Sequence, residues 1–224
     1  MTNTLTSSIV QHADNAKAMV VLAHGAGADK SHAFMTRIAD GLVANGISVC
    51  RFNFPYMDKR IEDGKKRPPD RMPKLLPCFA EQTNALDTDL PLFIGGKSMG
   101  SRVGAILTSN EAVEQGLPDD ITLTKVIKGT FCLGYPFHAI GKADKVRLSP
   151  VTNRSSDLLI VQGERDKLGD ENEIKGYSLP EHVIVKYLAD GDHDLKPRVK
   201  SGFTHEQHIT TAIAHIVEYI DQRR

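Results

Sequence analysis

The sequence contains little cysteine, no excess of charge of either sign and no long hydrophobic run. Its three cysteines are too few and too scattered for a disulfide framework or a zinc site, which suits a reducing compartment. Lysine and arginine total 28, as do aspartate and glutamate, so net charge gives no reason to expect nucleic-acid or membrane binding. No apolar stretch approaches membrane-spanning length, and residues 1–17 lack a secretory-signal pattern. We therefore expect a cytoplasmic protein, and no protein partner is indicated.

Short apolar runs alternate with amphipathic stretches along a chain of 224 residues, without an internal repeat or a low-complexity linker. This pattern predicts a single domain over residues 1–224, of the α/β class, with a mainly parallel, doubly wound sheet. Residues 55–74 are rich in charge and proline, and we expect a long surface loop there. Strands are predicted at 9–10 on an edge and at 18–23, 47–53, 92–94, 126–131, 158–161 and 182–188, and helices at 31–44, 73–86, 102–110, 171–177 and from Thr204, which forms a capping-box pair with Gln207.

A G-x-S-x-G pattern follows directly on the apolar strand 92–94 and precedes a helical stretch. It consists of Gly96, Ser98 and Gly100. Strand, tight turn and helix with a serine at the turn is the context of a nucleophile elbow. A side chain at either glycine would collide with the neighbouring strand or helix, since the turn is so sharp. The pattern therefore makes Ser98 a candidate nucleophile.

Two other motifs are incomplete. Gly-Lys-Ser at 96–98 suggests a phosphate-binding loop, but that motif requires a glycine where Pro91 stands. The sequence His205-Glu206-Gln207-His208 is one residue shorter than the H-E-x-x-H motif of zinc proteases. We therefore expect neither a nucleotide site nor a metal site, and no cofactor.

Chemically useful residues follow four of the predicted strands. His24 and a glycine-rich loop follow 18–23, Ser98 follows 92–94, Asp166 follows 158–161 and His193 follows 182–188. In open α/β sheets the active site lies at the carboxyl ends of the strands, and the order Ser, Asp, His is that of α/β-hydrolase triads. We assign Ser98 as nucleophile, His193 as general base and Asp166 as its carboxylate partner. His24 is expected to shape its loop rather than to carry protons.

The carboxylate is the least constrained of these assignments. Glu164 and Asp170 lie near Asp166, and Asp192 and Asp194 flank the histidine. We favour Asp166 because it follows the appropriate strand, whereas sequence neighbours rarely reach the correct imidazole nitrogen. For the oxyanion hole, the backbone N–H groups of Ala26 and Met99 are the expected donors.

With these residues in place, the chain resembles the α/β-hydrolase superfamily, and more narrowly its small dienelactone-hydrolase-like group. Related domains occur in testis-expressed protein 30 and in the third regulatory subunit of the NSL acetyltransferase complex. The resemblance implies a three-layer fold and the same triad of Ser98, Asp166 and His193. Classical dienelactone hydrolases use a cysteine nucleophile. The connection 136–157 is too short for a cap domain, so a minimal version of the fold is expected. The resemblance is carried by LAHGAGAD, RFNFPYM, RPPD, GGKSMGSR, CLGYPFH, VQGERD and DGDHDLKP.

These observations favour a serine hydrolase that cleaves a small carboxylic ester or thioester through an acyl-enzyme. Two alternatives are an interaction module with little or no turnover and an acyltransferase. Lys97, inside the elbow, has no role that the sequence explains. The cluster of Lys65, Lys66 and Arg67 is more often a solvated loop than a substrate clamp. The alternative hypothesis is a basic rim, which would favour acidic acyl groups or phosphorylated substrates and to which Arg71, Lys74, Lys196, Arg198 and Lys200 could add.

Overall fold

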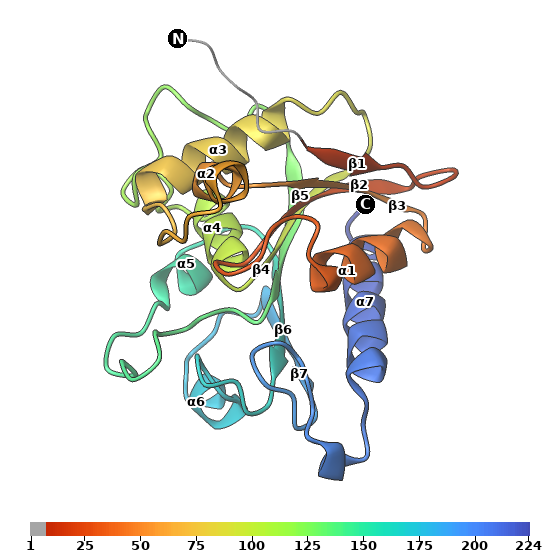
Figure 1. Cartoon of the computed structure of the whole chain (residues 1–224), viewed down its shortest axis with the longest axis vertical. Helices are drawn as coiled ribbons and strands as arrows, with labels where there is room; N and C mark the ends of the chain where they lie inside the picture. Colours follow the sequence, from red (N-terminus) through yellow and green to blue (C-terminus); the bar gives the residue numbers. More distant parts are fainter. Residues whose placement is uncertain (1–7) are drawn as a thin grey trace.

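A twisted seven-stranded sheet forms the centre of the computed structural model, which describes residues 8–224 (Figure 1). The strand order is β1-β3-β2-β4-β5-β6-β7; β1 pairs antiparallel with β3, and every other neighbouring pair is parallel. The expected edge strand and the mainly parallel sheet are thus confirmed. The strands are β1 (Ile9–Gln11), β2 (Ala18–Ala23), β3 (Ile47–Phe52), β4 (Leu92–Lys97), β5 (Ile127–Leu133), β6 (Leu158–Gly163) and β7 (Val183–Leu188).

Helices cover both faces of the sheet and give three layers (Figure 1). One face packs against α1 and α7, and the other against α3 and α4, with α5 and α6 extending this layer along β5 to β7. The helices are α1 (Ala33–Val43), α2 (Pro55–Asp63), α3 (Met72–Asn84), α4 (Met99–Leu107), α5 (Ser149–Thr152), α6 (Glu171–Lys175) and α7 (His205–Asp221), with the 3₁₀ turn η1 (Val199–Ser201).

Burial explains why the central strands read as unbroken apolar runs. All six residues of β2, of β4 and of β6 are buried, because helices cover these strands on both sides. The last helix, α7, presents Ile209, Ile216 and Ile220 to the sheet. Its start carries the predicted capping box, in which the Thr204 side chain accepts from the N–H of Gln207. Among the described residues, no helix is long and apolar enough to cross a bilayer.

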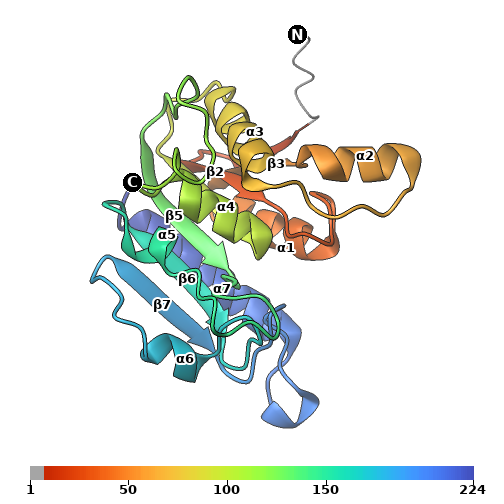
Figure 2. The same ribbon diagram turned by 90° about the vertical axis from the view of Figure 1, so that its left-hand side faces the viewer.

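The expectation of one long loop at 55–74 is wrong in its first half, because residues 55–63 form α2. Pro55 occupies the first turn, where its missing N–H costs nothing, and Gly64 ends the helix in the left-handed conformation at φ 69°. The helix projects from the body of the molecule, and the chain returns from it to α3 (Figure 2). The charged composition reflects this exposure and not a lack of structure.

Candidate active site

Ser98 lies at a strained turn between β4 and α4. Its backbone has φ 54° and ψ −111°, a conformation that non-glycine residues rarely adopt. A Cβ on Gly96 would lie 2.3 Å from the backbone carbon of Gly100, and one on Gly100 would lie 2.5 Å from the carbonyl oxygen of Ala23 in β2. The expected steric requirement for both glycines is confirmed. The turn lifts the Ser98 side chain to the carboxyl edge of the sheet.

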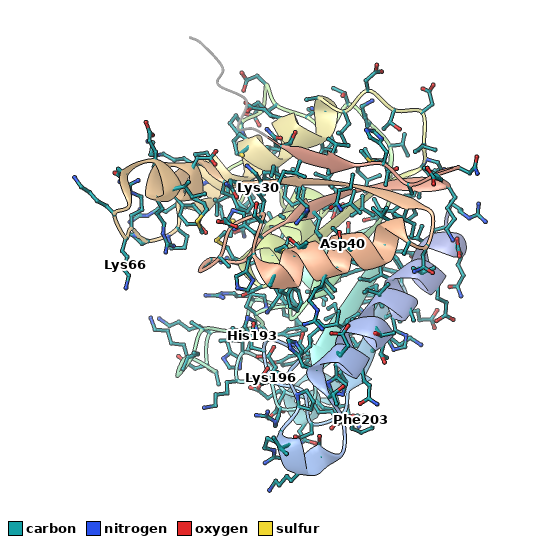
Figure 3. All side chains as sticks on the ribbon, turned by 45° about the vertical axis from the view of Figure 1, so that its right-hand side comes forward. Lys30, Asp40, Lys66, His193, Lys196 and Phe203 are labelled. Carbon is teal, nitrogen blue, oxygen red and sulfur yellow. The ribbon has the colours of Figure 1, made fainter. Side chains whose placement is uncertain are left out.

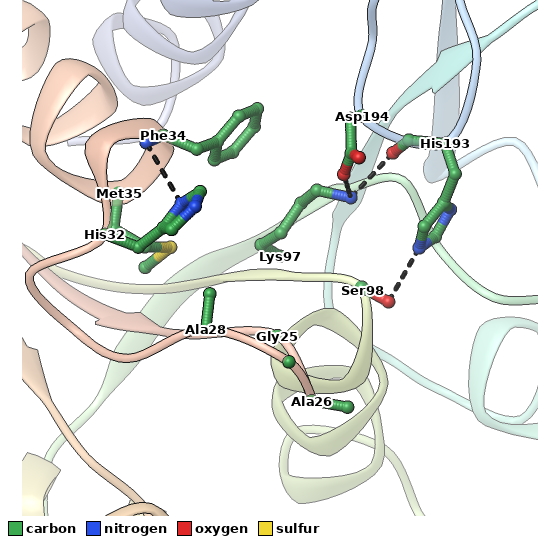
Figure 4. Close-up of a pocket in the computed structure, with 11 residues that line it drawn as sticks. Gly25, Ala26, Ala28, His32, Phe34, Met35, Lys97, Ser98, His193 and Asp194 are labelled. Atoms are coloured by element: carbon green, nitrogen blue, oxygen red, sulfur yellow. Dashed lines mark hydrogen bonds and ion pairs between the residues drawn. The ribbon is translucent and has the colours of Figure 1, made fainter. Parts of the chain in front are cut away.

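Three of the sequence-predicted side chains meet at this edge. His193, in the loop after β7, has its Nε2 atom 2.7 Å from Ser98 Oγ (Figure 4). Its Nδ1 atom lies 2.8 Å from Oδ2 of Asp166, which follows β6. The Asp166 side chain is fully buried, whereas that of His193 is 26% exposed. A continuous chain of hydrogen bonds therefore runs from an interior carboxylate to a serine hydroxyl at the surface of a pocket.

Asp166 is held by two further donors. The Gln162 side-chain amide donates to Oδ2 at 2.9 Å, and the N–H of Leu168 donates to Oδ1 at 2.8 Å. Gln162 is itself fixed, because its side chain accepts from the N–H of Tyr135 and donates to the carbonyl of Gly169. The role of Gln162 in holding Asp166 was not predicted from the sequence. An unusual glutamine at the end of an otherwise apolar strand was the available signal.

The other candidate carboxylates face different groups. Glu164 accepts from the N–H of Asp190, and Asp170 caps α6. Asp192 accepts from two backbone N–H groups of its own loop. Asp194 forms an ion pair with a lysine. None of the four contacts the imidazole in the part of the chain that the structure describes.

That lysine is Lys97, the residue that the sequence left unexplained. Its Nζ atom donates to the carbonyl oxygen of His193 at 2.6 Å and lies 3.2 Å from Asp194 Oδ1 (Figure 4). Its ammonium group also lies 5.6 Å from the centre of the Phe34 ring. Burial lowers the pKa of Lys97, and Asp194 opposes that shift. Lys97 therefore links the elbow to the loop after β7, through a hydrogen bond to His193 and an ion pair with Asp194.

His24 organises the glycine-rich loop after β2. Its Nε2 atom accepts from the N–H of Phe54 at 3.0 Å, so Nδ1 carries the proton and donates to the carbonyl oxygen of Gly25 at 2.6 Å. Burial lowers the pKa of His24 to about 4, which keeps the ring neutral near pH 7. The expectation that His24 shapes its loop is confirmed.

This bond also orients the N–H of Ala26. In a trans peptide the C=O and the following N–H point in opposite directions, so fixing the Gly25 carbonyl fixes the Ala26 donor. The carbonyl of Ala26 accepts from the Tyr56 hydroxyl at 3.0 Å, which holds the next peptide. Met99 begins α4, where N–H groups have no intrahelical acceptor. Among the described residues neither N–H is bonded to a protein acceptor.

Two pockets meet at Ser98, and Ala26 lines both. The smaller, of about 300 Å³, is bordered by His193, Lys97 and the loop that follows β2 (Figure 4). The larger, of about 610 Å³, lies between the loop before α3, the start of α4 and the connection after β5. Met99 lines this larger pocket. Ser98 is thus open on two sides.

Most residues of the hypothetical basic rim do not line the pockets at Ser98, in agreement with the favoured solvated-loop interpretation. Lys66 lies at the outer end of the projecting segment, away from His193 (Figure 3). Arg67 pairs with Asp63, and Arg198 is paired in the same way with a neighbouring aspartate. Arg71 is the member of the rim that lines the larger pocket. Among the described residues, no group of three or more histidine, cysteine, aspartate or glutamate side chains is arranged to hold a metal ion.

The chain belongs to the alpha/beta hydrolase domain family, whose profile matches residues 16–221. Its fold is shared with several solved structures at low sequence identity. Est1E from Butyrivibrio proteoclasticus, solved with ferulic acid bound, is 13% identical, with 97% of this chain and 94% of that chain covered and a TM-score of 0.64. A dienelactone hydrolase from Anabaena variabilis is 12% identical, with coverages of 96% and 91% and a TM-score of 0.66.

An esterase from Pyrococcus furiosus is 16% identical, with 97% of this chain and 92% of that chain covered and a TM-score of 0.65. These coverages show that nearly the whole of each structure corresponds to nearly the whole of this one. The three-layer α/β-hydrolase fold expected from the sequence is thereby confirmed.

Proposed function

We propose that the protein is a serine hydrolase that cleaves a small carboxylic ester or thioester through an acyl-enzyme intermediate. The observation that carries the proposal is the hydrogen-bond chain from Asp166 through His193 to Ser98, at a strained strand-to-helix turn. A serine hydroxyl is a weak nucleophile at neutral pH, so it needs a base within hydrogen-bond reach. His193 Nε2 is 2.7 Å away and meets that requirement.

In the first half of the reaction, Ser98 Oγ attacks the carbonyl carbon while its proton passes to His193 Nε2. Asp166 accepts the Nδ1–H bond, holds the tautomer and stabilises the imidazolium that forms. The bond from the carbonyl carbon to the leaving oxygen or sulfur then breaks, and the leaving group takes the proton from Nε2. An alcohol or thiol departs, and the acyl group remains on Ser98.

In the second half, a water molecule gives a proton to Nε2 and its oxygen attacks the acyl carbon. The bond to Ser98 Oγ breaks, and Nε2 returns the proton to Oγ. Overall, one ester or thioester and one water molecule are converted into one carboxylic acid and one alcohol or thiol.

Both tetrahedral intermediates carry an oxyanion, for which we assign the N–H groups of Ala26 and Met99. Support comes from their lack of protein acceptors among the described residues and from the bond that fixes the Ala26 peptide. The start of α4 adds the positive end of a helix dipole. Loss of one such donor typically raises the activation barrier by about 3 kcal/mol.

The test is hydrolysis of 4-nitrophenyl acetate and of an N-acetylcysteamine thioester by the wild type and by Ser98→Ala. We expect turnover by the wild type and its loss in the variant. Ser109→Ala is the matched control, because that hydroxyl donates to the carbonyl of Ile106 at the far end of α4. Turnover that survives in Ser98→Ala would refute the assignment of the nucleophile. Acyl transfer to added alcohol in preference to water would favour the acyltransferase alternative.

A further inference from the structure

The larger pocket beside Ser98 contains three arginines. Arg102 comes from α4, Arg147 from the connection between β5 and α5, and Arg71 from the end of the loop that precedes α3. They come from three separate segments of the chain that the fold brings to one cavity. Arg102 ends the stretch GGKSMGSR that contains Ser98, whereas Arg147 lies outside every motif quoted for the resemblance.

Arg102 is one helical turn after the nucleophile, since its backbone N–H donates to the carbonyl oxygen of Ser98 at 3.1 Å. Its Nε atom is buried and has no hydrogen-bond partner among the described residues, and no described carboxylate pairs with its guanidinium. Burial lowers the pKa of Arg102, and the like charge of Arg147 lowers it further. A desolvated cation without a partner is costly, so an anion from outside would be bound favourably here.

Arg147 has little to neutralise it either. Its guanidinium is 3.5 Å from the carbonyl oxygen of Pro136, at the limit of a hydrogen bond, and it forms no ion pair with a described residue. The carboxylate in the pocket, Asp70, is 3.6 Å from the ammonium of Lys74. The pocket therefore keeps a surplus of positive charge next to the reacting serine.

The position of His193 decides which part of the substrate enters this pocket. His193 borders the smaller pocket and does not line the larger one. The leaving group must receive its proton from His193 Nε2, so it belongs on the side of the smaller pocket. The acyl chain is then directed into the larger pocket, toward the arginines.

We propose that the preferred substrate carries an acyl group that ends in an anionic group, a carboxylate or a phosphate, held by Arg102 and Arg147. This inference rests on the proposed serine hydrolase function and adds the substrate class. A planar guanidinium donates two parallel hydrogen bonds to either kind of anion, and two guanidiniums facing one cavity would fix its end. Arg71, exposed at the rim, would add long-range attraction.

The experiment compares kcat/KM for mono-4-nitrophenyl adipate and for 4-nitrophenyl hexanoate, which differ in a terminal carboxylate against a terminal methyl group. We expect the adipate ester to be preferred by at least about tenfold. A second pair places the charge on the leaving side, 4-acetoxybenzoate against its methyl ester, and there we expect no preference. Adipate and inorganic phosphate, added to hexanoate assays, identify which anion competes.

Arg147→Gln and Arg102→Gln should each lower the ratio of adipate to hexanoate kcat/KM by about tenfold or more. Lys145→Gln is the matched control; it removes an exposed positive charge from the same connection but does not line the pocket, and it should leave the ratio unchanged. Circular dichroism and labelling of Ser98 by a fluorophosphonate establish that each variant is folded.

Equal rates for the two acyl esters, or a preference confined to the leaving side, would overturn this inference. Either result would leave the serine hydrolase proposal standing, provided that the hexanoate ester is cleaved at Ser98. Absence of all hydrolysis and of labelling in the wild type would instead remove the proposed function itself.

Discussion

The ammonium group of Lys97 donates a 2.6 Å hydrogen bond to the carbonyl oxygen of His193. The residue directly before the proposed nucleophile thereby holds the backbone of the proposed base. Ser98 and His193 are 95 positions apart in sequence, and this bond ties the end of β4 directly to the loop after β7. The relative position of these two segments decides whether the serine can lose its proton.

Lys97→Met should therefore act on the reaction and not only on stability. Methionine keeps the length of the buried chain but removes the donor, so the histidine loop loses its anchor. We expect kcat to fall by about 10- to 100-fold with a smaller change in KM. The rate of fluorophosphonate labelling should fall in parallel. The exposed Lys59→Met is the control; an unaltered labelling rate in Lys97→Met would show that the bond has no positioning role.

Asp166→Asn tests the carboxylate. An amide at this position no longer accepts the Nδ1–H bond reliably, so the imidazole adopts the wrong tautomer for taking the Ser98 proton. Loss of the acid in such triads typically lowers kcat by about ten-thousandfold. Asp192→Asn is the matched control, because this neighbour of His193 accepts from two backbone N–H groups and lies 3.9 Å from Arg165, but has no hydrogen bond to the imidazole among the described residues. Comparable kcat values for the two variants would contradict the assignment.

Gly96→Ala tests the packing that creates the elbow. The added Cβ would lie 2.3 Å from the backbone of Gly100, and backbone atoms cannot move aside as a flexible side chain can. We expect a loss of unfolding free energy of about 3 kcal/mol or more, measured by urea denaturation. Gly27→Ala is the control and should be near neutral, since a Cβ on Gly27 would have no neighbouring atom within 4 Å. Equal stability of the two variants would refute this steric account.

His24 predicts a specific dependence of stability on pH. In the unfolded chain its pKa is near 6.5, whereas burial lowers it to about 4 in the folded protein. The unfolded state therefore binds a proton first as the pH falls, and the contribution of His24 is fully present above pH 6.5 and lost between pH 6.5 and 4. The shift corresponds to about 3 kcal/mol.

We expect urea denaturation curves to show this loss in the wild type and a flatter profile over the same interval in His24→Gln, which cannot titrate. The variant should be less stable near pH 7, because it cannot reproduce both ring hydrogen bonds. Parallel profiles for the two proteins would show that His24 is not a buried neutral base.

Much of the fold could be predicted from sequence because helices cover both faces of the central strands. That burial produces continuous apolar runs such as those of β2 and β6. The exposed helix α2 was missed for the opposite reason, since a charged helix with few buried contacts resembles a loop in composition. Pro55 and Gly64 were helix boundary signals that could have revealed it.

The candidate site was predictable as far as strand order could place it. Ser98, Asp166 and His193 each follow a strand, so their meeting at one edge follows from the parallel sheet. A polar residue at the end of an apolar strand marked Gln162 as unusual, but its partners, like those of Lys97, depend on how loops fold back over the strand ends, which no local pattern encodes. For the same reason, sequence could not show that Arg102 and Arg147 line the pocket, while the lysines of the hypothetical basic rim are exposed.

Fluorophosphonate labelling followed by peptide mass spectrometry, on the wild type and Ser98→Ala, tests directly whether Ser98 is the nucleophile. The reagent reports a serine that is activated by its surroundings, whatever the natural substrate. We expect a single phosphonylated peptide with the adduct on Ser98, and no adduct in the variant. Absence of labelling in the folded wild type, or an adduct that persists in Ser98→Ala, would contradict this expectation.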